Sequence, residues 1–122
     1  MRKIALLGST GSIGTQALDI IRAHSDLFEA YLLTANDNAD LLIRQAREFV
    51  PDSVVIANAD KYDYVSEALA DLPIKVYAGA DAICDVVTAS PIDIVLTAMV
   101  GFSGLRPTVA ALKAGKAIAL AN

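Results

Sequence analysis

Short apolar runs alternate with amphipathic stretches along the whole chain. The apolar runs are rich in Val, Ile, Leu and Ala and predict six strands, at residues 4–7, 30–34, 53–57, 74–77, 92–97 and 117–120. Between them, apolar positions recur at helical spacing and predict five helices, at about residues 12–24, 41–49, 60–72, 80–88 and 107–114. Strands that alternate with helices in this way indicate an α/β fold built on a doubly wound parallel sheet.

Capping and helix-breaking residues mark several of the expected helix ends. Asn38 is expected to cap the second helix, because its side chain can accept a hydrogen bond from the first turn. Pro73 should stop the third helix, since proline cannot donate a backbone hydrogen bond. Pro107 suits the first position of the fifth helix and Gly115 the residue just past its end.

A glycine-rich turn joins the first predicted strand to the first predicted helix. Gly8, Gly11 and Gly14 stand three residues apart, whereas the dinucleotide-binding pattern is G-x-G-x-x-G, so Thr10 occupies the place of its second glycine. An ordinary strand-to-helix turn would also carry such glycines. The strand before, the helix after and a second strand-like run at 28–35 favour a Rossmann-like unit, in which the helix N-terminus holds a pyrophosphate.

Composition narrows the class of protein. The chain has 122 residues, which is enough for one domain with its own core, and 55% of them are hydrophobic. No apolar run approaches the ~18 residues of a membrane span. The net charge of −4 offers no basic surface for nucleic acid, and a single cysteine, Cys84, excludes an internal disulfide. With no leader segment visible, we expect a cytoplasmic protein.

Few side chains are suited to catalysis. The one histidine, His24, falls at the far end of the first helix, where the helix dipole favours it, and Cys84 is expected to pack in the fourth helix. The aspartates fall in loops and at helix starts, where capping explains them. We therefore predict a chain that holds a nucleotide but contains no catalytic and no metal-binding residue.

Two loops at the carboxyl ends of strands are candidates for cofactor recognition. In the run Thr-Ala-Asn-Asp-Asn at 34–38, Asp37 would favour the ribose hydroxyls of NAD, whereas Asn36 and Asn38 suit either a ribose or a phosphate. These residues leave NADH and NADPH open. In the loop at 97–104, Ala98 and Gly101 are small enough for a nicotinamide ribose to pass, although a plain connecting loop fits equally well.

The chain ends just past the sixth predicted strand, where the ligand site of such a sheet is expected. We interpret residues 1–122 as the cofactor-binding part of a larger protein. Such a part would expose apolar surface, which we expect around Met99, Val100 and Phe102, and would tend to self-associate.

Three stretches together resemble the 1-deoxy-D-xylulose 5-phosphate reductoisomerase family. They are Gly-Ser-Thr-Gly-Ser-Ile-Gly at 8–14, Ala-Met-Val-Gly-Phe-Ser-Gly-Leu-Arg-Pro-Thr at 98–108 and Ala-Gly-Lys-Ala-Ile-Ala-Leu-Ala-Asn at 114–122. The resemblance covers the whole chain and implies an enzyme that uses NADPH and a divalent metal (magnesium, manganese or cobalt). Such an enzyme rearranges and reduces 1-deoxy-D-xylulose 5-phosphate to 2-C-methyl-D-erythritol 4-phosphate in the non-mevalonate isoprenoid pathway, and fosmidomycin competes with its substrate.

The resemblance also implies roles for particular residues. Asn38 would lie near the adenosine ribose phosphate and Asn122 near the nicotinamide. The pyrophosphate and the adjoining ribose would be held by Thr10, Gly11, Ser12 and Ile13. The ligands of the metal and of the sugar phosphate would belong to a part of the enzyme outside this chain, and the full-length enzyme would be a homodimer. Many members carry Gly and then Lys or Arg before the asparagine, where this chain has Asn36 and Asp37.

Two other readings remain at this point. Another two-domain reductase, such as homoserine dehydrogenase or dihydrodipicolinate reductase, has a similar build, but the stretch at 98–108 argues against both. A non-catalytic Rossmann domain that only senses a dinucleotide is an alternative from a different functional class.

Overall fold

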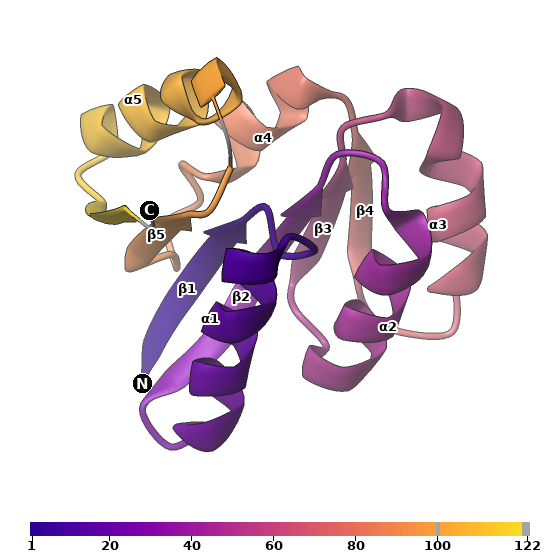
Figure 1. The fold of residues 1–122 in the computed structure, drawn as a ribbon, viewed down its shortest axis with the longest axis horizontal. Helices are drawn as coiled ribbons and strands as arrows, with labels where there is room; N and C mark the ends of the chain where they lie inside the picture. Colours follow the sequence, from indigo (N-terminus) through magenta and orange to yellow (C-terminus); the bar gives the residue numbers. More distant parts are fainter. Residues whose placement is uncertain (100, 121–122) are drawn as a thin grey trace.

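The computed structural model describes residues 1–99 and 101–120, which fold into alternating strands and helices (Figure 1). The strands are β1 (Arg2–Leu7), β2 (Phe28–Ala35), β3 (Ser53–Ile56), β4 (Lys75–Ala78), β5 (Ile94–Thr97) and β6 (Ala117–Leu120). The helices are α1 (Ser12–Ala23), α2 (Ala39–Phe49), α3 (Tyr62–Ala68), α4 (Ala80–Val86) and α5 (Leu105–Lys113), with short 3-10 turns η1 (Ala59–Lys61) and η2 (Gly101–Gly104).

Within the described residues, the six strands form one parallel sheet in the order β4-β3-β2-β1-β5-β6. The chain builds one half outward from β1 to β4 and then returns to place β5 on the other side of β1. Strand order therefore reverses between β1 and β5, and this switch point is where open α/β sheets bind their ligands, at the carboxyl ends of the strands. The predicted doubly wound Rossmann-like sheet is confirmed.

Helices cover both faces of the sheet, which explains why the strands are continuous apolar runs. On one face, Leu6 and Leu33 pack under α1, α2 and α3. On the other, Leu7 and Leu32 pack under α4 and α5. Adjacent residues of one strand, such as Leu6 and Leu7, are thus both fully buried. Figure 1 shows α4 and α5 on the opposite side of the sheet from α1 and α2.

The capping residues behave largely as expected. The Asn38 side chain accepts a hydrogen bond from the Leu41 N–H at 3.2 Å and caps α2. His24 follows the last residue of α1, and Gly115 takes the left-handed conformation after α5 with φ of +80°. Pro107 is the third residue of α5, not the first, because the helix already begins at Leu105. Its missing N–H still falls in the first turn, where no helical partner exists.

The third predicted helix is shorter than the pattern at 60–72 indicated. It begins as the 3-10 turn η1 and ends at Ala68, and residues 70–72 continue only as irregular turns. Pro73 keeps Leu72 out of the helical region, but the helix ends four residues before Leu72, at Ala68. The prediction that the helix runs up to Pro73 is therefore wrong.

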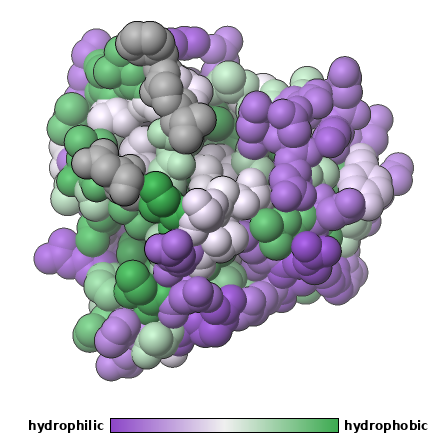
Figure 2. All heavy atoms as spheres, in the orientation of Figure 1, coloured by the Kyte–Doolittle hydropathy of each residue, from purple (hydrophilic) through white to green (hydrophobic). Residues whose placement is uncertain are grey.

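Four of the exposed large hydrophobic side chains lie on α5 and β6. Leu105, Val109 and Leu112 form a stripe along the outer side of α5, and Leu120 of β6 is also exposed. Figure 2 shows hydrophobic residues gathered over the α5 side of this view and hydrophilic ones over α2 and α3. Of the patch predicted from the sequence, Met99 packs partly buried against the core. Val100 and the Phe102 side chain lie outside the described residues.

A matched pair of glycine substitutions tests how tightly α1 packs on the turn after β1. A Cβ on Gly14 would lie 2.1 Å from the Gly8 carbonyl oxygen, whereas a Cβ on Gly11 meets no described atom within 4 Å. We expect Gly14→Ala to lower the free energy of unfolding by about 3 kcal/mol. Gly11→Ala, at an ordinary extended φ of −76°, should change it little. Urea denaturation of the two variants measures the difference, and equal midpoints would refute the packing argument.

Candidate nucleotide-binding cleft

The turn between β1 and α1 forms the floor of the site. Gly8 has φ of +84°, a conformation that favours glycine, and its N–H donates to the Thr34 hydroxyl at 3.0 Å. A Cβ on Gly8 would lie 3.1 Å from the backbone carbonyl group of Ala98, at the end of β5. The turn therefore brings together Gly8 and Ala98, which the sequence had placed in two separate loops, and leaves no room for a larger residue at position 8.

The N-terminus of α1 opens onto this turn. Gly11 precedes the helix in an extended conformation, and no side chain of the described residues caps it. The first helical hydrogen bond runs from the Thr15 N–H to the Gly11 carbonyl at 2.9 Å. The backbone N–H groups of residues 12–14 precede that bond, so they and the positive end of the helix dipole are available to an anion.

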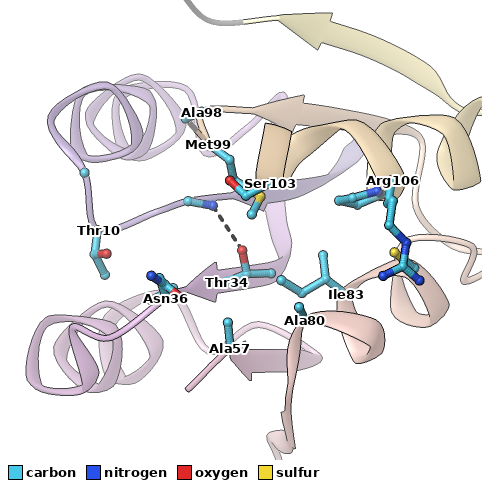
Figure 3. Close-up of a pocket in the computed structure, with 15 residues that line it drawn as sticks. Thr10, Thr34, Asn36, Ala57, Ala80, Ile83, Ala98, Met99, Ser103 and Arg106 are labelled. Atoms are coloured by element: carbon cyan, nitrogen blue, oxygen red, sulfur yellow. Dashed lines mark hydrogen bonds between the residues drawn. The ribbon is translucent and has the colours of Figure 1, made fainter. Parts of the chain in front are cut away.

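A cleft of about 410 Å³ lies over the switch point, which is within the size range of small-molecule sites. Figure 3 shows Thr10 and Asn36 at one end of it and Arg106 at the other. Its walls come from the ends of β1, β2, β3 and β5 and from α4 and α5. The lining residues are Gly8, Thr10, Gly11, Thr34, Ala35, Asn36, Ala57, Ala80, Ile83, Cys84, Ala98, Met99, Ser103, Arg106 and Pro107.

Five of the predicted site residues line this cleft: Gly8, Thr10, Gly11, Asn36 and Ala98. Ser12 and Ile13 follow directly in the first turn of α1. Asn38 lines a neighbouring cavity of about 260 Å³ at the start of α2. Asn122 lies outside the described residues.

The wall contributed by α4 and α5 was missed from the sequence. Ala80, Ile83 and Cys84 project from α4 into the cleft, so Cys84 is half-buried at the site and does not pack in the core as expected. Arg106 of α5 donates to Asp81 of α4 at 2.9 Å, and this exposed ion pair raises the pKa of the Arg106 guanidinium. No spacing signal marks these residues, because their approach to the turn depends on where β4 and β5 lie in the sheet.

Asp37 has a set of partners that the sequence did not suggest. Its carboxylate accepts hydrogen bonds from the side-chain amides of Asn36 at 3.0 Å and Asn58 at 2.9 Å. Lys61 of η1 donates to the Asp37 backbone carbonyl at 2.7 Å. Asp37 thus borders the smaller cavity, together with Asn38 and Lys61. Its neighbour Asn36 lines the main cleft, which Asp37 does not. The sequence missed Asn58 and Lys61, which follow β3 and reach this corner because β3 pairs with β2.

Among residues 1–99 and 101–120, no three His, Cys, Asp or Glu side chains come together in a way that could hold a metal ion. In the same part of the chain, no helix combines the length and apolar character needed to cross a membrane.

Sheet order, glycine turn and a cleft at the switch point define a nucleotide-binding domain of the Rossmann type. The family model for 1-deoxy-D-xylulose 5-phosphate reductoisomerase matches residues 4–122 of the chain. The chain therefore belongs to the 1-deoxy-D-xylulose 5-phosphate reductoisomerase family. This membership decides against the other reductases and the dinucleotide sensor considered from the sequence.

Individual relatives agree with the family match. The chain is 65% identical over 121 residues to the reductoisomerase of Phocaeicola vulgatus, covering 99% of this chain and 32% of that protein. Its identity to the Porphyromonas gingivalis reductoisomerase is 68% over 121 residues, with 99% and 31% covered. The chain thus spans about a third of the length of the curated relatives it matches.

Solved structures share the fold described above. The reductoisomerase of Zymomonas mobilis in complex with NADPH superimposes with a TM-score of 0.92 and 38% identity, covering 99% of this chain and 32% of that one. A reductoisomerase in complex with NADPH, fosmidomycin and magnesium gives a TM-score of 0.95 and 35% identity, covering 100% of this chain and 30% of that one.

Proposed function

We propose that residues 1–122 form the NADPH-binding domain of a 1-deoxy-D-xylulose 5-phosphate reductoisomerase. The observation that carries this proposal is the cleft over the switch point, in which a glycine turn and an uncapped helix N-terminus lie beside Ala98, the small residue that follows β5. These groups fit a dinucleotide, because backbone N–H groups can bind the pyrophosphate where no side chain intervenes. The similarity to a relative in complex with NADPH supports the choice of cofactor.

For each part of the cofactor, the chain has residues suited to contact it. Thr10, Gly11, Ser12 and Ile13 would hold the pyrophosphate and the adjoining ribose with the first turn of α1. Asn36 and Asn38 lie where the adenosine ribose would be, and the apolar surface of Ala57, Ala80 and Ile83 suits the adenine ring. The small side chain of Ala98 would let the nicotinamide ribose lie close to the backbone, and Asn122 would lie near the nicotinamide. When bound, NADPH supplies the hydride for a reduction.

The activity of the whole enzyme is part of the proposal. It would rearrange and reduce 1-deoxy-D-xylulose 5-phosphate to 2-C-methyl-D-erythritol 4-phosphate with a divalent metal, and a similar structure contains magnesium and fosmidomycin. We assign no metal or sugar-phosphate ligand to this chain and derive no step through either. A cytoplasmic location, a homodimeric enzyme and the use of manganese or cobalt in place of magnesium are proposals that rest on the family resemblance.

The direct test is cofactor binding by a Gly11 variant. The space beside Gly11 is open, so a valine there would occupy the position of the pyrophosphate without disturbing the fold. We expect Gly11→Val to weaken NADPH binding by at least about a hundredfold, the equivalent of losing two charge-assisted hydrogen bonds. Calorimetry measures the affinity and urea denaturation confirms that stability is retained. Unchanged affinity in a folded variant would refute the assignment of the turn.

Cys84 offers a chemical probe of the cleft. Because this lone cysteine lines the cavity and is half-buried, iodoacetamide should alkylate it in the free protein. At about ten times its Kd, NADPH should slow the reaction about tenfold, since only the unliganded fraction reacts. Mass spectrometry follows the modification, and Gly11→Val should show no protection. Equal rates with and without NADPH in the wild-type chain would place the cofactor elsewhere.

Asp37 should weaken the preference for NADPH. Its exposed carboxylate, held by Asn36 and Asn58, places a negative charge beside the expected position of the 2′-phosphate. Asp37→Asn should tighten NADPH binding about threefold at low salt and change NADH binding less, because exposed charges contribute at most ~1 kcal/mol. Asp26→Asn, between α1 and β2 at the other end of the sheet, is the matched control. A larger gain for NADH than for NADPH would contradict this role.

A further inference from the structure

One polar side chain stands out on the buried face of α2. Gln45 is only 7% exposed and lies between Leu42 and Ala46, both fully buried, in the core under the sheet. Burying an amide is unfavourable unless its donor and acceptor both find partners. A leucine or methionine would satisfy the packing alone, so the glutamine indicates a requirement for hydrogen bonding at this position.

The partner of Gln45 is Ser9, in the glycine turn. The Ser9 hydroxyl donates to the Gln45 side-chain carbonyl at 2.7 Å, and the Gln45 amide donates to the Ser9 backbone carbonyl at 2.9 Å. These two bonds close a ring between residues 36 positions apart in the chain. On the opposite side, the Ser9 N–H donates to the Thr34 carbonyl of β2 at 2.8 Å. Ser9 is therefore held between β2 and α2, completely buried.

The second bond of the ring orients the next peptide unit. In a trans peptide, the carbonyl oxygen and the following N–H point in opposite directions. The Ser9 carbonyl points toward Gln45, so the N–H of Thr10 points away from α2, on the side where Thr10 lines the cleft. Rotation of this peptide would break the bond to Gln45 and leave the buried Gln45 amide without its acceptor in the core, which is unfavourable.

We infer that Gln45 is a positioning residue for the cofactor: through Ser9 it fixes the glycine turn in the shape that presents the Thr10 N–H to the pyrophosphate. This inference rests on the proposed NADPH site. It also links the two ends of that site, because Asn38, at the N-terminus of the same helix, lies at the expected adenosine end.

The test compares two ligands on the same 122-residue chain. Gln45→Met keeps the volume of the side chain and removes both hydrogen bonds. It should weaken NADPH about tenfold, while 2′-AMP, which has the adenosine and its 2′-phosphate but no pyrophosphate, should bind as it does to the wild type. Calorimetry measures NADPH, NMR titration measures the weaker 2′-AMP, and the ¹⁵N-resolved Thr10 amide signal should shift in the variant.

Gln45→Glu provides a second variant in case the methionine prevents folding. At pH 8 the ionised carboxylate cannot donate to the Ser9 carbonyl, so NADPH should bind weakly. Toward pH 5 the buried acid becomes neutral and can donate again, so binding should recover relative to the wild type.

The outcomes separate this inference from the proposed function. If the wild-type chain does not bind NADPH, the proposed function is wrong. If it does, and the folded Gln45 variants bind NADPH within about twofold of the wild type, Gln45 does not position the turn. An equal loss for NADPH and 2′-AMP would show that Gln45 only supports the fold, and this also overturns the inference.

Discussion

The contact between Gly14 and the Gly8 carbonyl is the constraint on which the site depends. Because α1 begins directly over the turn that ends β1, its N-terminus lies at the switch point of the sheet and not beside it. The positive φ of Gly8 then turns the chain beneath the end of β5. A cleft follows from this geometry, because no side chain from either glycine fills the space between β1, β5 and the helix.

The two helices that flank the turn contribute to the site in different ways. α1 offers backbone N–H groups, whereas α2 offers side chains: Asn38 at its start and Gln45 two turns later. Beside Asn38, the Asp37 carboxylate accepts a hydrogen bond from the Asn36 amide, and Lys61 donates to the Asp37 backbone carbonyl. The position before Asn38, where the family resemblance implied a cation, is thus an aspartate held by two amides, with a lysine close to its backbone.

Local sequence patterns predicted the features that are determined within one strand and the turn next to it. Burial on both faces made the strands visible as apolar runs, and the glycines marked the turn because backbone geometry demands them. The cleft wall formed by Ile83 and Cys84 could not be predicted this way, since it depends on α4 lying across the sheet from the turn. Lys61 was missed for the same reason, and α3 ends at Ala68 although the apolar spacing continues up to Pro73.

The place of β1 between β2 and β5 has a consequence for how the chain folds. β1 pairs first with a strand about 25 residues away and then with β5, whose residues lie 90 positions further along, as Ile4 pairs with Ile94. Contacts of such long range form slowly, because a large loop must close before they contribute. During synthesis one edge of β1 therefore stays unpaired until β5 has been made. The nucleotide cleft is among the last features of this sheet to assemble, although its glycine turn is made before β2 to β6.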